Sequence, residues 1–461
     1  MKDKFFHLHP TVATIIAQIA CHDNALPQGS PSSPFISNFV ANILDVKLLR
    51  LCKRAHCTYT RYADDLTFST NERLFPLEIA EPLAGAEWMV GRQLQDIIES
   101  NGFKLNPDKT RMSLRRSRQS VTGLVVNAKV NIRQEYYRFV RAMCDSVFKT
   151  GTWHRPLANN DIKPGEEAST PDRMTGLRPL EGMLTHIYFV KGRHDRTPKK
   201  NKLIEFAAPK APIELYRRLL FYKHFVANEL PIIVTEGVSD VVYLKCAINS
   251  LAAKFPTLVS ADGKRSLCFL NPSGVSRAVL NLGHGASGQG SLIEQYARRL
   301  KHYRHLPLIK PVIILCDNDD GLSQVTKIGS KVIKNVSKLT TDSFYHLGYN
   351  LYLVKIPEGQ PPTSRDAEDL FPTQWLSQLI DQKPFDKKKD HGDHTAYGKV
   401  VFAERIVRAN AKSIDFSGFE ELLQRIAECI ADYATRSTAA PPVQVATSPG
   451  AASSGAVSGS P

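Results

Sequence analysis

The stretch Tyr59-Thr-Arg-Tyr-Ala-Asp-Asp-Leu-Thr-Phe-Ser69 decides how the first part of the chain folds. Apolar and aromatic residues flank two adjacent carboxylates, Asp64 and Asp65, on both sides. This pattern predicts two short β-segments joined by a tight turn that presents the acids at its tip. Neighbouring carboxylates repel each other unless a cation neutralises them, and two Mg²⁺ ions can clamp the attacking and leaving oxygens of a phosphoryl transfer. For the pair taken alone, a solvated turn is the alternative.

A rigid loop and a helix precede this predicted hairpin. Residues 26–34 read Leu-Pro-Gln-Gly-Ser-Pro-Ser-Ser-Pro, and the prolines with Gly29 exclude a helix there. Gln28 offers a polar head for a base, sugar or phosphate, and Gly29 lets a ligand approach the backbone closely. Apolar residues at helical spacing from Ile36 to Leu51 predict a helix directly after the loop. By itself such a loop is more often a structural turn.

In this order and at this spacing, the loop, the helix and the acidic hairpin resemble the palm of reverse transcriptases, most closely those of bacterial retrons. The resemblance implies that Asp64 and Asp65 bind the metal ions of a polymerase. It also implies that Gln28 and Gly29 line the site of the template and the incoming nucleotide.

The likeness continues downstream. Residues 101–110 resemble the next family motif, which implies that Lys109 lies near the nucleotide phosphates. Residues 121–127 resemble the primer-grip region, whose Val-Thr-Gly triplet implies a role for Thr122 and Gly123 in recognising the cognate structured RNA. Residues 135–150 place apolar side chains on one helical face and basic ones elsewhere, as expected of a thumb helix along a duplex backbone. An ordinary amphipathic surface helix is the alternative for that segment.

One family feature is missing from the sequence. Palms of this family carry a third metal-binding aspartate on an earlier strand, well before the loop. Asp3 is followed by Phe5-Phe6, but it lies too close to Leu26 to fill that role. We therefore expect the fingers and half of the catalytic metal site to lie outside this sequence. This leaves open a polymerase-inactive scaffold that binds RNA or DNA.

The composition favours a nucleic-acid partner. The 461 residues include 60 lysines and arginines against 45 acidic residues, a formal charge of +15 that attracts polyanions in a salt-dependent way. The eight cysteines form no Cys-x-x-Cys pair and no set with zinc spacing, so we expect buried thiols in a reducing cytosol. No apolar run reaches membrane-spanning length and no signal peptide opens the chain, which predicts a cytoplasmic protein.

Strands and helices alternate from Pro231 onward. Strands are expected at 232–235, 267–270, 311–316 and 351–356, which predicts a doubly wound α/β fold with its site at the carboxyl ends of strands. The acidic segments 236–240 and 317–320 each follow such a strand. A single acid at a strand end is often a helix cap, but two such segments favour a metal site. Oxygen ligands without His or Cys select a hard cation such as Mg²⁺.

This second part resembles the TOPRIM domain of topoisomerases, bacterial primases and OLD-type nucleases. The resemblance implies that Glu236 is a general acid/base or metal-contacting group, that Asp317 and Asp319 hold Mg²⁺, and that Asp240 and Asp320 support it. Residues 367–371 resemble a further acidic motif of the nuclease members, with a plain helix start as the alternative. A base or phosphate contact could come from His394, Tyr397 or Lys399, although polar loop residues are the default there.

Together these features predict a multidomain α/β and α+β protein. Its expected parts are a partial reverse-transcriptase palm at 1–130, a thumb and basic connector at 131–229, a TOPRIM nuclease-like domain at 230–436 and a disordered tail at 437–461. The combination resembles retron reverse transcriptases with a fused TOPRIM effector. It implies an RNA-directed DNA polymerase that makes RNA-linked DNA from a structured RNA, with a Mg²⁺-dependent nuclease effector in antiphage defence.

The implied partners are a structured non-coding RNA, its RNA-linked DNA, deoxynucleotides and a nucleic-acid substrate of the second domain, with no membrane. The alternative is a truncated scaffold that retains or anchors the nuclease. The sequence leaves the oligomeric state open.

Overall fold

The computed structural model describes residues 8–84, 87–154, 173–192, 211–260, 262–270, 274–282, 285–359, 363–388 and 395–439. The chain divides into two compact units, Met1–Gln134 and Glu135–Pro461, here called the N-terminal and C-terminal units. Several sequence predictions fall outside the described residues: Asp3, most of the basic run at 191–202, His394 and nearly all of the expected tail.

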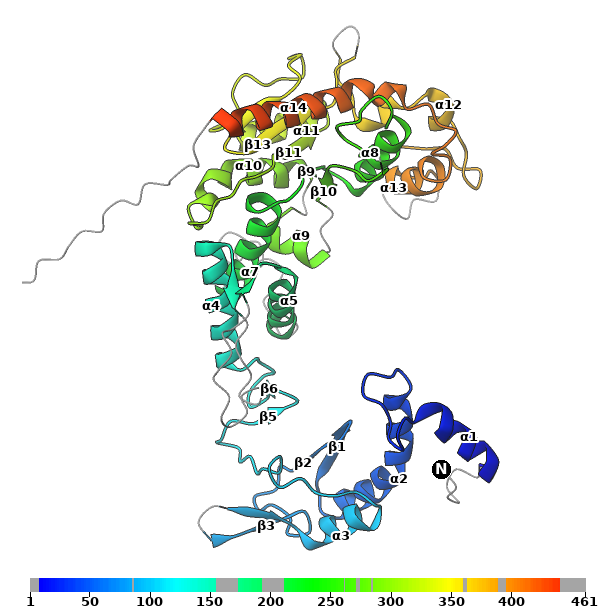
Figure 1. Cartoon of the computed structure of the whole chain (residues 1–461), viewed down its shortest axis with the longest axis vertical. Helices are drawn as coiled ribbons and strands as arrows, with labels where there is room; N and C mark the ends of the chain where they lie inside the picture. The colour runs from blue at the N-terminus through cyan, green and yellow to red at the C-terminus, as the bar shows by residue number, and fades with distance from the viewer. Residues whose placement is uncertain are drawn as a thin grey trace, which may run out of the picture. The chain divides into compact units, whose positions relative to one another are not determined.

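The N-terminal unit is built of three helices and short antiparallel strand pairs within the part of the chain that the structure describes (Figure 1). Its elements are α1 (Pro10–Ala20), α2 (Ser33–Arg54), β1 (Thr58–Tyr62), β2 (Asp65–Ser69), β3 (Ala80–Pro82), β4 (Trp88–Val90), α3 (Arg92–Ser100), β5 (Ser120–Val121) and β6 (Leu124–Val125).

Helix α2 carries the hairpin β1–β2. Leu44, Leu48 and Leu51 recur at helical spacing along one side of α2 and are buried against α3 and the inner face of the hairpin. Leu66 and Phe68 supply that inner face. The small core therefore fixes the hairpin on the helix that precedes it, as the alternating pattern predicts.

The C-terminal unit begins with helices that pack on one another. They are α4 (Gln134–Thr150), α5 (Arg178–Gly192) and α7 (Ala211–Phe221), with a π-helical turn η2 (Tyr222–Val226) and the short pair β7 (Trp153–His154) and β8 (Arg173–Met174). On α4, Val140, Cys144 and Val147 are buried. The Phe148 ring lies 5.2 Å from that of Tyr303, which belongs to the α/β part. The segment expected as a thumb thus shares one compact unit with the α/β part.

A five-stranded sheet forms the centre of this unit, in the order β10-β9-β11-β13-β12. The first four strands are parallel, and β12 is an antiparallel edge strand. The elements are β9 (Ile232–Val234), α8 (Val238–Ser250), β10 (Cys268–Phe269), α9 (Gly274–Leu280), α10 (Ala286–Leu300), β11 (Val312–Cys316), α11 (Asp320–Ile328), β12 (Tyr345–Gly348), β13 (Leu351–Lys355), η3 (Ala367–Leu370), α12 (Thr373–Leu376), α13 (Lys399–Val401), η4 (Phe402–Val407), η5 (Ser417–Phe419) and α14 (Glu420–Ala439).

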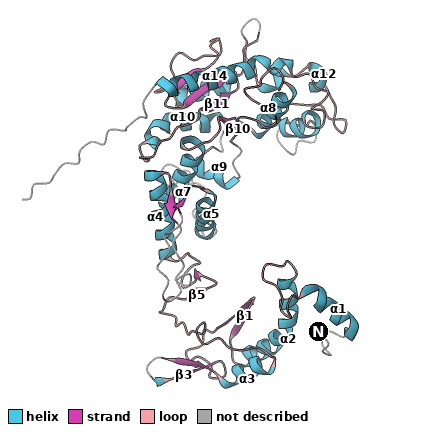
Figure 2. Ribbon diagram, viewed as in Figure 1, coloured by secondary structure: helices cyan, strands magenta, loops and turns pink. Residues whose placement is uncertain are grey.

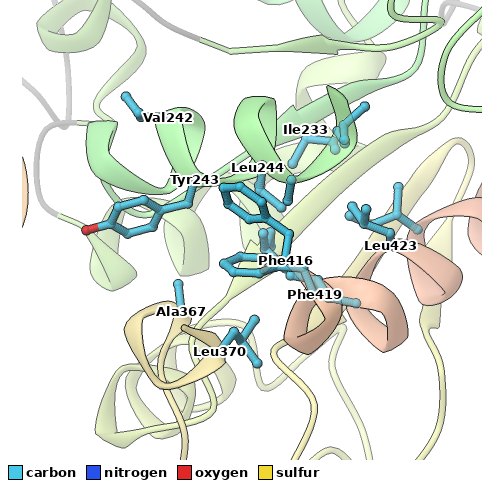
Figure 3. Close-up of a cluster of buried hydrophobic side chains, with 14 of the residues drawn as sticks. Ile233, Val242, Tyr243, Leu244, Ala367, Leu370, Phe416, Phe419 and Leu423 are labelled. Atoms are coloured by element: carbon cyan, nitrogen blue, oxygen red, sulfur yellow. The ribbon is translucent and has the colours of Figure 1, made fainter. Parts of the chain in front are cut away.

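Helices enclose this sheet (Figure 2). Ile233 and Ile313 belong to a large apolar cluster. This cluster includes Tyr243 of α8, Phe419 of η5 and Leu423 of α14, which Figure 3 shows near Ile233. The alternate strand residues Ile232, Val312 and Ile314 are equally buried but lie outside that cluster. Because successive side chains of a strand point to opposite faces, both faces of the sheet are covered, as a doubly wound fold requires.

The structure differs from the sequence predictions in several details. All four expected strands are shorter, and β12 was not predicted because Gly348 and Tyr349 interrupt its pattern before β13. Helix α7 passes directly into the π-helical turn η2, and the segment 367–371 forms the 3₁₀ turn η3 (Ala367–Leu370). All eight cysteines are free, but only Cys52, Cys144, Cys316 and Cys429 are buried. No helix among the described residues is long and apolar enough to cross a membrane.

Candidate functional site

The first candidate site is the turn between β1 and β2. Tyr62 pairs with Asp65 across the hairpin, so Ala63 and Asp64 form its two-residue loop. Ala63 has a φ of 53°, a conformation that costs energy for a residue with a Cβ. The side chain of Asp64 is 81% exposed, and Asp65 is exposed at the start of β2. The two predicted carboxylates are therefore adjacent and open to solvent.

Arg61 ties this turn to α2. Its guanidinium forms two hydrogen bonds with the Asp45 carboxylate, at 2.8 and 2.6 Å, and a third with the carbonyl of Ala63 at 3.0 Å. The Tyr59 hydroxyl donates to the same carboxylate at 2.7 Å. The hydrogen bond from Arg61 holds the pKa of Asp45 below its usual value, against the effect of burial. The contact between Asp45 and Arg61 was not predicted from the sequence. The available signal was a lone carboxylate within the apolar pattern of α2, because a partly buried carboxylate needs a partner of opposite charge.

The other predicted residues of this unit are spread around the turn. The Lys109 ammonium lies 3.5 Å from the Asp64 carboxylate. Among these predicted residues, Lys109 is the only one for which the structure describes a contact with the acids. Gln28 and Gly29 are exposed in the loop before α2, where Gly29 has a φ of 88°. The Ser33 hydroxyl closes this loop by donating to the carbonyl of Pro27 at 2.7 Å.

Thr122 and Gly123 form the tip of a second hairpin. They connect β5 to β6, with φ values of 46° and 82°. Two successive positive values are the pattern of a type I′ turn, and this conformation is unusual for a β-branched threonine. Both residues are exposed. The Val-Thr-Gly triplet is therefore presented as a protruding, strained turn.

The second candidate site lies at the carboxyl ends of β9 and β11. In the sheet, β9 lies between β10 and β11. The next strand in sequence, β10, is on one side of β9, and the following strand, β11, is on the other side. The strand order therefore reverses between β9 and β11. Ligands bind at such a switch point in open α/β sheets. Glu236 follows β9 and Asp317 follows β11, which brings the two predicted acidic segments to one place.

Two glycines leave room beside Glu236. A Cβ on Gly321 would lie 2.9 Å from the Asp319 carboxylate and 3.3 Å from that of Glu236, and a Cβ on Gly285 would lie 2.9 Å from Glu236. Burial, and then the charge of Asp319, raise the pKa of Glu236, while the backbone N–H of Ala286 opposes them. Glu236 and Asp319 therefore face a common space that only glycine keeps open.

Asp240 and Asp317 form a second, deeper pair. They line one cavity of about 10 Å³, close to the room that one water molecule needs. Burial raises the pKa of Asp240 to about 7, although the backbone N–H of Gly237 donates to it at 2.9 Å. Burial and the charge of Asp240 raise the pKa of Asp317 to about 8. Without a cation, these carboxylates tend to keep a proton at neutral pH.

Lys399 and Glu368 border this pair. The Lys399 ammonium lies 2.8 Å from the fully buried Glu368 carboxylate, which also accepts a hydrogen bond from Tyr243 at 3.1 Å. Burial is the largest single effect and lowers the pKa of Lys399, but the charge and hydrogen bond of Glu368 together with the charges of Asp317 and Asp366 outweigh it, so the net pKa is raised. Tyr397, by contrast, donates its hydroxyl to the carbonyl of Gln378 at 2.6 Å and serves packing.

Asp320 lies apart from the other acids. Its side chain is fully exposed and pairs with Lys338 at 2.7 Å. The Lys338 carbonyl accepts from the buried Asn318 amide at 3.1 Å. Since alternate residues of an extended segment share a side, Asp317 and Asp319 point toward the site, whereas Asp320 starts α11 and points away. The structure gives no support to Asp320 as a metal ligand.

Gln289, on α10, joins the two strands that carry the acids. Its amide nitrogen donates to the carbonyls of Val234 at 3.3 Å and Leu315 at 2.9 Å, and its oxygen accepts from the Cys316 thiol at 3.1 Å. Each of these carbonyls lies two residues before an acidic position, Glu236 or Asp317. One buried amide therefore fixes the separation of the two strand ends. The sequence offered only a weak signal, a Gln within a glycine-rich segment.

The residues at the switch point fit a divalent cation. The acids here supply only oxygen ligands, which suit hard cations. A cation would fill the space that Gly285 and Gly321 keep open. It would also relieve the mutual repulsion of the buried carboxylates. In the conformation described, no three His, Cys, Asp or Glu side chains of the described residues are close enough together to hold an ion. Binding therefore requires side-chain rotation.

Comparisons with known proteins concern the N-terminal part. Residues 15–139 match the family model described as reverse transcriptase (RNA-dependent DNA polymerase). The chain is 35% identical over 187 residues to the retron Mx162 reverse transcriptase of Myxococcus xanthus, covering 39% of this chain and 35% of the relative. It is 35% identical over 138 residues to the retron Ec86 reverse transcriptase of Escherichia coli, covering 30% of this chain and 40% of the relative.

The chain thus spans between about a third and two-fifths of the length of these curated relatives. No solved structure matches the chain. The matched residues form part of a retron-type reverse-transcriptase domain, and they include the acidic hairpin, the loop before α2 and the Val-Thr-Gly turn.

Proposed function

We propose that this chain is part of an RNA-directed DNA polymerase that makes RNA-linked DNA from a structured RNA. The observation that carries the proposal is the solvent-exposed Asp64-Asp65 turn, held on α2 by Arg61, within a segment similar to retron reverse transcriptases. Asp64 and Asp65 would bind Mg²⁺ there. Lys109, 3.5 Å from Asp64, would contact the phosphates of the deoxynucleotide once the metal takes the carboxylate.

Roles for the remaining predicted residues follow from the same likeness. Gln28 and Gly29 would line the template and nucleotide site, because they are exposed in a loop whose backbone is closed by Ser33. Thr122 and Gly123 would contact the structured RNA, because a protruding turn can enter a groove or loop of RNA.

The C-terminal unit would act as a TOPRIM-type, Mg²⁺-dependent nuclease, an effector in antiphage defence. Its support is the meeting of Glu236, Asp317 and Asp319 at the strand-order switch point. Bound Mg²⁺ would supply positive charge to the phosphate under attack. Burial and the charge of Asp319 raise the pKa of Glu236 above its ordinary value, a direction that suits a carboxyl group to acid–base work. Asp240 and Lys399 would hold the orientation and charge of this acidic group.

Two single substitutions in the complete gene product separate these activities. Asp64→Asn should abolish primer extension on an RNA template and leave nuclease activity unchanged. Glu236→Gln should do the opposite, and in cells it should remove toxicity toward the host. Asp320→Asn is the matched control, because this exposed acid lies apart from the site, and it should preserve both activities. Undiminished DNA synthesis by the Asp64 variant would refute the polymerase assignment.

The alternative is a polymerase-inactive scaffold that binds RNA or DNA and anchors the nuclease. One observation favours it: the cation nearest Asp64 in the described part of the chain is Lys109, which already neutralises that carboxylate. This alternative predicts Mg²⁺-dependent cleavage with no nucleotide incorporation by the wild-type protein in the same preparation.

A further inference from the structure

A basic groove lies on α2 and α3, away from the acidic turn. It has a volume of about 610 Å³ and is lined by Lys47, Arg50, Lys53, Arg54 and Ile97. We infer that this groove binds the phosphate backbone of a structured RNA. The inference rests on the proposed function, which supplies that RNA, and it adds a contact surface to which neither sequence motif nor relative points.

The groove and the acidic turn use different sides of one helix. Asp45 of α2 holds Arg61 and thereby the turn. Lys47 lies two residues further along, a rotation of about 200° about the helix axis. Lys47, Arg50 and Arg54 then follow one another at spacings of three and four residues, which places them in a row. An RNA in the groove would therefore not compete with a primer end at Asp64 and Asp65.

The side chains of the groove lack acidic partners. Within the described residues, Arg50, Lys53 and Arg54 take part in no ion pair, and no acid lines the groove. Arginines on other helices of this chain are paired along the helix, as in Arg425 with Glu421 and Arg436 with Asp432. Four unneutralised cations around one hollow repel each other, so a bound polyanion would relieve them.

One of the four cations is held in place. The Lys47 ammonium donates to the Asn101 side-chain oxygen at 2.8 Å, and the Asn101 amide in turn donates to the carbonyl of Ile97. Lys47 keeps two further N–H groups for a ligand. A plain solvated helix end, where Lys53 and Arg54 only complement the helix dipole, would need neither the hollow nor this fixed lysine.

The dimensions suit a nucleic-acid strand. The eight helical residues from Lys47 to Arg54 extend about 10 Å along the axis of α2, which corresponds to about three base steps of one strand along a duplex axis. Arginine pairs with phosphate through two parallel hydrogen bonds. RNA is the expected occupant because, under the proposed function, it is the template and is present before any DNA is made.

The test measures RNA binding by the full chain. A fluorescein-labelled RNA stem-loop is titrated at salt concentrations between about 0.05 and 0.3 M, with a DNA stem-loop of the same sequence in parallel. Removing two phosphate contacts by Arg50→Gln/Arg54→Gln should lower the slope of log K against log salt by about 1.4–1.8. Affinity at 0.15 M salt should fall roughly 20-fold by the same relation. The control is Arg73→Gln/Arg92→Gln, two exposed arginines of the same unit outside the groove.

A second readout needs no variant. Acetylation of the wild-type chain should modify Lys47 and Lys53 more slowly when RNA is bound, relative to exposed Lys334 and Lys412. An unchanged slope in the groove variant, an equal loss in the control variant, or a larger loss for DNA than for RNA would overturn the inference. Primer extension distinguishes the two proposals: wild-type protein that binds RNA through the groove but makes no DNA counts against the polymerase alone.

Discussion

Replacing Asp317 by asparagine should make the metal-free protein more stable at neutral pH, although the change removes a predicted ligand. Burial and the charge of Asp240 raise the pKa of Asp317 to about 8 in the folded chain, whereas an unfolded aspartate has a pKa of about 3.9. Between these values the folded state holds a proton that the unfolded state has released. The free energy of unfolding therefore falls as pH rises through this window, by about 1.4 kcal/mol per pH unit.

The penalty reaches about 4 kcal/mol at pH 7, three units above the unfolded pKa. Asparagine cannot ionise, so this loss of unfolding free energy with rising pH does not apply to it, but its amide must still be buried. We therefore expect a net gain of about 2–4 kcal/mol at pH 7, or roughly 5–15 °C in the unfolding midpoint. At pH 4 the two proteins should have nearly equal stability, since the wild-type carboxyl is then protonated in the folded state.

Scanning calorimetry with EDTA at pH 4, 5.5, 7 and 8 measures this difference. Excess Mg²⁺ should raise the midpoint of the wild-type protein and leave that of the Asp317→Asn variant nearly unchanged. The control is Asp320→Asn: the hydrogen bond and charge of Lys338 lower the pKa of this exposed acid, so its loss should slightly destabilise the protein. A variant less stable than wild type at pH 7, or a difference independent of pH, would show that Asp317 is not held among repelling acids.

Three further predictions test the supports of the two sites. Asp45→Ala should destabilise the N-terminal unit by about 2–4 kcal/mol, because it leaves Arg61 largely buried without its carboxylate partner. It should also reduce primer extension, whereas Asp64→Asn should leave stability unchanged. Urea unfolding measures the stability of each variant, and extension rates measure its activity. Gly321→Ala should lower nuclease activity more than stability, because its Cβ would fill the space between Glu236 and Asp319, and Gly182→Ala, at a position with open space, is the comparison. Gln289→Leu should cost about 1–3 kcal/mol in urea unfolding by removing the buried hydrogen bonds to β9 and β11; stability equal to wild type would contradict its role.

Local pattern was enough to predict the elements that carry the acids. The alternation around Asp64 and Asp65 predicted the hairpin β1–β2, and apolar runs ending in acids predicted β9 and β11. These features depend on neighbours in sequence, where the period of side chains decides which face is buried. Asp320, by contrast, was assigned to the metal group by resemblance, and it points away because it already begins α11 directly after Asp319.

Contacts between distant residues could not be read in this way. The bond between Arg61 and Asp45 joins a strand to a helix, and the bonds of Gln289 join α10 to strands on either side of it in sequence. Their formation depends on how elements pack, which a single sequence does not state. The same holds for the ion pair of Lys399 with Glu368 and for the hydrogen bond of Tyr243 to Glu368, because these residues are far apart in the sequence.

The side chain of Gln289 has a consequence for how this protein can vary. It donates twice and accepts once while buried, and no other amino acid of that length offers this combination. Glutamate would bring an ion into the core, methionine would bring no donor, and asparagine would fall one methylene short. Substitution of Gln289 should therefore disturb the spacing of the two strands that carry the acids, whereas changes in the surrounding loops leave these hydrogen bonds in place.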